Sequence, residues 1–501
     1  MRAACFLAFC TGFLSLSMEI LWIRLFAFSN HSMPQAFAFV LATFLVGIAL
    51  GAYVGKLFCK SSRDLWAVSG LVLILSSVCD LTGPWLYANV VFSGHQLLVG
   101  GAIMMLTALL KSVVFPIAHH LGTPAFGVNL GQNVSRVYVS NILGATLGPL
   151  FTGIVLLALV TTQQSFVICA ALTLLVAFYC LRDVLSRFAL SVSALALSCQ
   201  FALILSLSGH DLVAKVAIPG YGNIINMLEN QYGIITIYAD KHGDNIVAGG
   251  NAYDGSTNLD PVFNSNRINR VIIMSALVDH PTRVLMIGLS IGSWLKVVTT
   301  FPGVESIDVI EINPGYTKVI ENYPAQMMAL LDPRVHLYID DGRRWLKAHP
   351  DNRYDMIVMN TTYHWRAYIT NLLSQEFLKL LKKHMNPQAV LEYNSTGSPD
   401  VVKTAESVFK HAYLYENFVI AADFDWRKKL LTQEAVDKLS ALMMDGRPLY
   451  PAGSQKLIAG YLSLPIVQLG YVEPLYNALG RQLEVITDRN VITEFKYGRE
   501  L

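Results

Sequence analysis

The sequence predicts an α-helical membrane bundle followed by an α/β domain with a doubly wound sheet. The first observation is composition, because 53% of the 501 residues are hydrophobic and 14% are charged, against about 25% charged in soluble domains. The second is the distribution of charge: residues 1–207 hold 13 of the 72 charged side chains. The third is a run of alternating strand-like and helix-like segments from residue 283 onward, which is typical of a mostly parallel sheet.

Residues 1–208 are predicted to form a transmembrane domain of about seven helices. A helix needs about 20 mostly apolar residues to cross a bilayer. The first candidate is too long for a signal peptide and lacks a small-residue cleavage site, so we expect it to be retained. The seven candidates cover residues 3–28, 35–55, 66–91, 97–118, 137–160, 163–181 and 188–208.

Two kinds of residue inside these spans carry further information. Glycines at four-residue spacing line one helix face and predict close helix packing; they are Gly47, Gly51, Gly55, Gly144 and Gly148. Ionisable side chains are costly in lipid, so they should face the protein interior or water. These side chains, Glu19, Arg24, Asp80 and Lys111, either mark a transport or substrate path or hold the bundle together.

The distribution of Lys and Arg between the loops predicts the orientation in the membrane. Basic residues precede the first span and follow the second, fourth and sixth, while the other short loops have none. This pattern places the amino terminus inside a multi-pass protein of the cell (inner) membrane. Seven spans then place the soluble domain outside the cytoplasm, and one miscounted span would reverse that side.

Charge and cysteine content exclude several functions. The net charge of +2 and the lack of a basic run argue against a nucleic-acid partner. All seven cysteines lie in the apolar half, so disulfides and thiol catalysis are excluded from the soluble half. No cysteine or histidine pairing has metal-ligand spacing, so no metal is expected. The membrane lipid bilayer is the expected partner, and a homo-oligomer is left open.

The soluble half divides by pattern into three segments. Residues 209–230 are predicted to be a connector, and residues 231–282 a small antiparallel β subdomain with a linking helix. The second prediction follows from β-type residues that alternate between Gly, Asn and Asp turns. Residues 283–501 repeat a strand–helix plan and form the nucleoside-binding domain predicted next.

Three strand ends in this last segment predict a nucleoside site. Gly288 and Gly292 allow a tight turn and close approach of the backbone to a ligand. Glu311 lies 23 residues after Gly288, near the spacing expected for a carboxylate that binds ribose hydroxyls. Asp341 and Gly342 follow the third strand, where the carboxylate can accept from an adenine amino group. Each acid taken alone also fits a helix N-cap or a solvated loop.

The motifs "VIEIN" (309–313) and "DDG" (340–342) resemble the spermidine synthase family of aminopropyltransferases, which have a Rossmann-like, methyltransferase-type fold. "GFLSLSMEILWIRLF" and "VYVSNILGATLGPL" resemble integral-membrane proteins in which a helical domain is fused to a spermidine-synthase-like domain. "LLSQEFLKLLKKHMNP" and "ITDRNVITEF" extend the likeness. The resemblance implies decarboxylated S-adenosylmethionine or S-adenosylmethionine as donor, a small amine or polyamine as acceptor, and a place in polyamine biosynthesis.

The chain departs from the family where the catalytic aspartate is expected. The strand "YDMIVM" ends in Asn360, Thr361 and Thr362 instead of Asp-Ser-Ser, and "GLSIGS" and "RINRVII" replace the acidic glycine loop and a Tyr-x-Glu stretch. An asparagine cannot act as a base. Tyr363 and His364 are therefore the candidate catalytic groups beside Asn360, or else they form a lid. Tyr232, Thr361, Thr362 and Arg366 are the candidate substrate-binding residues.

Three functions remain open at this point. The first is transfer of a group, most plausibly aminopropyl, from an adenosyl sulfonium to an amine near the membrane. The second is methyl transfer or another reaction of intact S-adenosylmethionine, which needs positioning more than a base. The third is a sensor or transporter that binds a nucleoside or polyamine without turnover.

Overall fold

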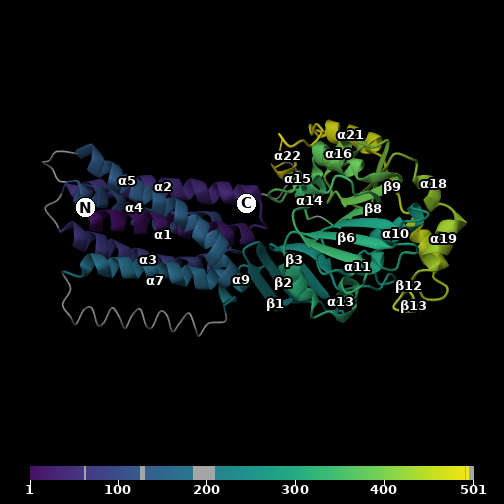
Figure 1. Cartoon of the computed structure of the whole chain (residues 1–501), viewed down its shortest axis with the longest axis horizontal. Helices are drawn as coiled ribbons and strands as arrows, with labels where there is room; N and C mark the ends of the chain where they lie inside the picture. The colour runs from purple at the N-terminus through teal and green to yellow at the C-terminus, as the bar shows by residue number, and fades with distance from the viewer. Residues whose placement is uncertain (61–63, 124–129, 184–208, 361, 491, 496–501) are drawn as a thin grey trace. The chain divides into compact units, whose positions relative to one another are not determined.

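The computed structural model describes all residues except 61–63, 124–129, 184–208, 361, 491 and 496–501. The chain forms two compact units, shown in Figure 1. A helical unit contains residues 1–218 and 229–231, and an α/β unit contains residues 219–228 and 232–500. Each unit is described by itself below.

The helical unit consists of long apolar helices. Six helices are long and apolar enough to cross a membrane, and they coincide with six of the seven predicted spans. The seventh predicted span (188–208) lies outside the described residues. A π-helical turn interrupts the fifth span just after Pro149. The helices are α1 (Arg2–Ser29), α2 (Pro34–Cys59), α3 (Leu65–Val90), α4 (Gln96–Gly122), α5 (Leu130–Leu150), η1 (Phe151–Leu156), α6 (Leu157–Leu159), α7 (Thr162–Leu181) and α9 (Asp211–Lys215).

The glycine rows allow two helix pairs to approach closely. A Cβ atom added to Gly51 of α2 would lie 2.3 Å from the carbonyl oxygen of Leu109 in α4. One added to Gly144 of α5 would lie 2.0 Å from the carbonyl oxygen of Phe9 in α1. Any larger residue would push the backbones apart, so the packing interpretation of these glycines is confirmed.

A buried ion pair joins helices α3 and α4. The Lys111 Nζ atom lies 2.5 Å from Asp80 Oδ1 and donates to Ser76 Oγ at 3.0 Å, and Thr173 Oγ1 of α7 donates to Asp80 Oδ2 at 3.3 Å. The side chains of Asp80 and Lys111 are at most 1% exposed. For these two residues the structure favours a role in holding three helices together, because both charges are paired and further hydrogen-bonded.

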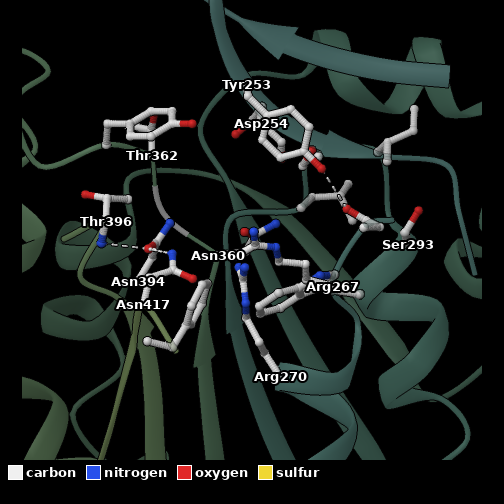
Figure 2. Close-up of a pocket in the computed structure, with 18 of the residues that line it drawn as sticks. Tyr253, Asp254, Arg267, Arg270, Ser293, Asn360, Thr362, Asn394, Thr396 and Asn417 are labelled. Atoms are coloured by element: carbon white, nitrogen blue, oxygen red, sulfur yellow. Dashed lines mark hydrogen bonds between the residues drawn. The ribbon is translucent and has the colours of Figure 1, made fainter. Parts of the chain in front are cut away.

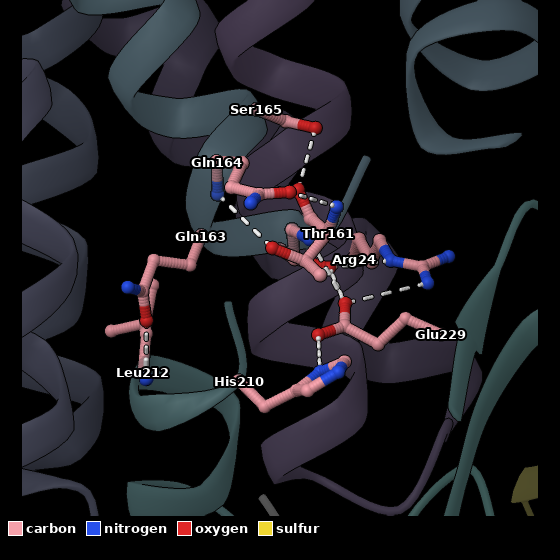
Figure 3. Close-up of polar contacts among 9 residues, drawn as sticks. Arg24, Thr161, Gln163, Gln164, Ser165, His210, Leu212 and Glu229 are labelled. Atoms are coloured by element: carbon pink, nitrogen blue, oxygen red, sulfur yellow. Dashed lines mark hydrogen bonds and ion pairs between the residues drawn. The ribbon is translucent and has the colours of Figure 1, made fainter. Parts of the chain in front are cut away.

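Glu229 is the centre of a second polar cluster in the helical unit (Figure 3). Its Oε2 atom accepts from the Thr162 amide at 2.9 Å and lies 3.8 Å from Arg24 Nη2, while Oε1 lies 2.9 Å from His210 Nδ1. Burial by itself raises the pKa of Glu229, but the hydrogen bonds from His210 and Thr162 and the charge of Arg24 bring it below its usual value. The carboxylate is thus buried, ionised and fully bonded. The span residue Arg24 is also accounted for by this cluster, since its Nε donates to Thr162 Oγ1 at 2.8 Å.

A four-stranded sheet opens the α/β unit, with strand order β1-β2-β3-β4 and antiparallel pairing of β2 with β3 and of β3 with β4. Its strands are β1 (Asn223–Asn230), β2 (Gly233–Ala239), β3 (Asn245–Gly249) and β4 (Ala252–Ser256). The first strand begins inside the segment 209–230 that we expected to be a connector. Apart from Glu229, whose side chain is buried, the residues of β1 are exposed or half-buried. The sequence of β1 lacks the apolar alternation that indicates a strand.

An eight-stranded mixed sheet forms the centre of the unit, with order β14-β10-β11-β9-β8-β5-β6-β7. Neighbours from β9 to β7 pair in parallel, whereas β11, β10 and β14 add antiparallel pairs at the other edge. The strands are β5 (Arg283–Ile287), β6 (Ser306–Glu311), β7 (Val335–Ile339), β8 (Tyr354–Met359), β9 (Met385–Asn394), β10 (His411–Tyr415), β11 (Phe418–Ala422) and β14 (Ile466–Val467). The short strands β12 (Met443–Met444) and β13 (Arg447–Pro448) pair separately.

Helices cover both faces of this sheet (Figure 1), which confirms the predicted doubly wound α/β fold. Alternate residues of β5 point to opposite faces: Val284 and Met286 belong to one apolar cluster, Leu285 and Ile287 to the other. The helices are α10 (Asn269–Leu277), α11 (Ser293–Val298), α12 (Gly315–Ile320), α13 (Pro324–Leu330), α14 (Gly342–Ala348), α15 (Thr370–Leu373), α16 (Gln375–Lys383), α17 (Pro399–Glu406), α18 (Arg427–Leu430), α19 (Gln433–Ser440), α20 (Gln455–Leu462), α21 (Leu469–Ala478) and α22 (Ile492–Phe495).

Candidate functional site

A cavity of about 370 Å³ lies in the α/β unit, where residues that follow β8 and β9 meet strand β4 and helix α10 (Figure 2). Ligands of open α/β sheets bind at the carboxyl ends of strands, so the position is typical of a binding site. Four asparagines and two arginines dominate its polar lining: Asn266, Asn360, Asn394, Asn417, Arg267 and Arg270. Trp294 and Phe418 supply apolar surface.

Asn360 is placed by the tight junction between β8 and β5. Its amide donates to the carbonyl of Ile287 at 3.0 Å. Gly288 follows Ile287 with φ +90°, and a Cβ atom there would lie 2.4 Å from the carbonyl oxygen of Asn360. Only glycine fits this contact, and it brings the first strand end against the Asn360 segment that borders the cavity.

The residues after Asn360 separate into those that line the cavity and those that support it. Thr362 and Tyr363 line it, and the ring of Tyr363 stacks on Trp365 with centroids 5.1 Å apart. His364 is 3% exposed, does not line the cavity, and both its amide and Nδ1 contact Thr396 Oγ1, at 2.9 and 2.7 Å. His364 therefore anchors the Thr396 loop in this structure.

The candidate substrate residues are also distributed unevenly. Arg366 lies behind the lining, where its Nη1 donates to Thr362 Oγ1 at 2.7 Å and burial lowers its pKa. Tyr232 is 54% exposed in the turn between β1 and β2 and does not line the cavity. Thr361 lies outside the described residues.

The predicted nucleoside residues lie at the ends of the neighbouring strands β5, β6 and β7. Glu311 ends β6, and its two carboxylate oxygens accept from the amides of Leu289 and Asn313, each at 2.8 Å. Burial raises the pKa of Glu311 to about 7. The carboxylate is thus oriented by two backbone amides and keeps further lone pairs for a ligand.

The other nucleoside candidates are the first residues of helices. Asp341 is the N-cap of α14 and accepts from the Arg344 amide at 2.8 Å. Gly292 is the N-cap of α11 with φ +81°. A Cβ atom on Gly342 would lie 3.0 Å from the Ile287 side chain. Helix capping is therefore one role of Asp341, and it is an alternative that the sequence left open. Asp341, Gly292 and Gly342 do not line the cavity.

Three charged lining residues were missed in the sequence: Asp254, Arg267 and Arg270. Asp254 lies on β4, its carboxylate accepts from the Tyr316 hydroxyl, and burial raises its pKa. The two arginines occupy the "RINR" stretch, which we noted only as a departure from the family pattern. Two arginines three residues apart were the available signal, although only Arg270 lies in α10, while Arg267 precedes the helix with φ +49°.

Glu392 lies on β9, two residues before the lining residue Asn394 and hence on the same face of the strand. The residue is 0% exposed, and neither carboxyl oxygen has a hydrogen-bond partner in the described part of the chain. Burial raises its pKa well above the usual value, opposed by the charge of Arg270. Arg270 itself pairs with Glu416 at 2.8 Å.

No group of three His, Cys, Asp or Glu side chains within the described ranges could hold a metal ion.

Comparison with known proteins gives this fold a family context. The sequence model of the spermine/spermidine synthase domain matches residues 266–415. A polyamine aminopropyltransferase of Prochlorococcus marinus (strain MIT 9301) is 28% identical over 153 residues, or 28% of this chain and 53% of that protein. Spermidine synthase of Coffea arabica is 30% identical over 143 residues, or 28% of this chain and 42% of that protein. The chain therefore spans about half the length of these relatives or less.

A solved spermidine synthase from Thermotoga maritima superposes with a TM-score of 0.39 at 16% identity and covers 51% of this chain and 88% of that chain. The domain match includes Arg267, Arg270, Asp341 and Asn360, so it contains much of the site described above. The carboxyl-terminal part of this chain therefore carries a spermine/spermidine synthase domain, and six long apolar helices precede it.

Proposed function

We propose that the protein is a membrane-anchored transferase that moves an aminopropyl group from an S-adenosylmethionine-type donor to an amine. The observation that carries this proposal is the match of residues 266–415 to the synthase domain. The cavity of this domain lies beside the strand ends that are predicted to bind the nucleoside. The six apolar helices supply the anchor. Resemblance to the family makes decarboxylated S-adenosylmethionine the first donor to test.

The donor is assigned to the ends of β5, β6 and β7. The carboxylate of Glu311 would accept from the ribose hydroxyls, and Asp341 would accept from the adenine amino group. Gly288 and Gly342 allow these strand ends to pack closely against Asn360 and Ile287, where a Cβ atom would collide. In this arrangement the sulfonium-activated carbon would lie toward Asn360, which lines the cavity.

The reaction requires a neutral amine. Its nitrogen lone pair forms the new N–C bond while the C–S bond breaks, and the electron pair of that bond remains on sulfur as a neutral thioether. The nitrogen becomes an ammonium and must release a proton. Asn360 can orient the amine but cannot take the proton. Asp254 is the carboxyl group that lines the cavity, and burial raises its pKa, which makes its carboxylate a better proton acceptor than an exposed one.

Methyl transfer from intact S-adenosylmethionine is the second candidate, and Asn360 is the observation that favours it. Attack on a methyl group depends mainly on alignment of the reacting atoms. A strand end without a carboxylate is compatible with that requirement.

Product analysis distinguishes these reactions. The full-length protein in lipid nanodiscs would be supplied with each donor and a panel of amines. Methylthioadenosine indicates aminopropyl loss, and adenosylhomocysteine indicates methyl loss. A Glu311→Ala variant should lose both binding of the donor and product formation, while Glu305→Ala, an exchange in a loop before β6, serves as the matched control.

Donor binding without product from any amine would contradict catalysis and support a binding protein. Failure of methylthioadenosine to bind would contradict the whole assignment. A reporter fused after Leu501 would determine the side of the membrane, which the six helices do not specify.

A further inference from the structure

We infer that the acceptor is an anionic amine, one that carries a carboxylate beside its reacting nitrogen, and not a polycationic polyamine. This inference rests on the proposed function, because it assigns the substrate class of the same cavity. The observation behind it is the excess of guanidinium over carboxylate groups among the lining side chains.

The charged groups that line the cavity, and the oppositely charged partners of Asp254 and Arg270, can be assigned. Arg267 and Arg270 of the α10 region line it, as does Asp254 of β4. Arg366 lies behind Asp254, and its charge compensates that carboxylate. Glu416 pairs with the Nε side of Arg270.

The two remaining groups do not alter this balance. Burial favours the neutral form of Glu392. Tyr253 also lines the cavity, and burial raises its pKa to about 12, so it is neutral at physiological pH. With Asp254 matched by Arg366 and Arg270 matched by Glu416, the charge of Arg267 is left over. Arg267 has no ion-pair partner among the described residues.

A polyamine would meet an unsuitable surface here. A protonated diamine needs carboxylates at its ends, whereas the one lining carboxyl already accepts from Tyr316. The two arginines repel a cation, and their mutual repulsion contributes to the lowered pKa of Arg270. An anion between them would relieve that repulsion.

A carboxylate-bearing amine would satisfy both ends of the cavity. Its carboxylate would accept from Arg267 and from the Nη edge of Arg270, since Nε is the atom bonded to Glu416. Its amine would lie toward Asn360 and Asp254. The volume of about 370 Å³ is sufficient for a molecule the size of an amino acid.

Putrescine and L-ornithine form a matched pair of probes, because ornithine is putrescine with one added carboxylate. Binding of each to the full-length protein in nanodiscs would be measured by calorimetry with saturating methylthioadenosine. We expect ornithine to bind about tenfold more tightly or better. Arg267→Gln should remove most of that preference, and Arg267→Glu should reverse it in favour of putrescine.

Arg353→Gln exchanges an arginine outside the cavity, on an exposed loop, and should leave the ornithine preference unchanged. Arg267 is itself exposed, so its variants are expected to fold, and methylthioadenosine binding verifies this independently. Equal binding of the two probes, tighter binding of putrescine, no binding of ornithine, or an unchanged preference in Arg267→Gln would each overturn the inference. If methylthioadenosine fails to bind, the proposed function fails separately.

Discussion

The two units of this protein differ in the bonding of some of their buried acidic groups. In the helical unit, Asp80 is paired with Lys111 and Glu229 is bonded by Thr162 and His210. In the α/β unit, Glu392 is equally buried but has no hydrogen-bond partner in the described residues, and burial raises the pKa of Asp254. Satisfied charges indicate architecture, whereas unsatisfied or strongly shifted ones indicate a place where a ligand or proton is handled.

The largest effect is expected where the charge is paired. Asp80→Asn leaves the Lys111 ammonium buried without a counter-charge, which should destabilise the helical unit by about 3–5 kcal/mol. Thermal unfolding in detergent would measure this loss. The double variant Asp80→Asn with Lys111→Met should recover most of the stability, and a double variant as unstable as the single one would show that the pair does more than neutralise charge.

Replacing an amide by a carboxylate at the cavity should increase the transferase activity. Asn360→Asp places a carboxylate beside the proposed amine, and a positioned base typically contributes 100-fold or more. We expect aminopropyl transfer, followed as methylthioadenosine, to rise by about 100-fold. Asn360→Leu has no polar group and should not reproduce the gain. An Asn360→Asp protein that binds nucleoside with no gain would point to a different reaction.

Glu311 should make nucleoside binding depend on pH. Its pKa is raised from 4.5 to about 7, and ribose hydroxyls donate to the ionised form. Affinity for methylthioadenosine should therefore increase about tenfold between pH 6 and pH 8, as the ionised fraction increases. Glu311→Gln should bind weakly with no such dependence. A flat profile in the wild-type protein would remove Glu311 from the ribose contact.

The smallest effect on stability is expected for Glu392→Gln at pH 5. This variant, like Asp80→Asn, replaces a buried carboxyl group by an amide. Burial favours neutral Glu392 in the folded state. The stability it contributes is present below its ordinary pKa of 4.5 and is lost as the pH rises above that value. Wild type and variant should thus unfold alike at pH 5, and the variant should be the more stable at pH 9. Large destabilisation at pH 5 would reveal a partner for Glu392.

The sequence predicted the elements of the site better than their arrangement. Asn360, Gly288 and Glu311 were recognisable because strand tips in a βα repeat are marked by a change from apolar to polar residues. His364 was given a catalytic role on residue type and position, but the structure places it against Thr396 and off the cavity lining. Sequence distance cannot report which side of a loop faces a ligand.

Composition and local pattern by themselves determined that this chain has apolar spans and then an α/β fold. Hydrophobic content and the spacing of strand ends both depend on residues that are close together in the sequence. The tertiary structure alone decided the charge of the cavity. Asp254, Arg267 and Glu416 are far from Asn360 in sequence, and only folding brings β4, α10 and the β8 end to one cavity. Electrostatic balance depends on distances in space, which is why the arginine excess that identifies the acceptor class appears only once the chain is folded.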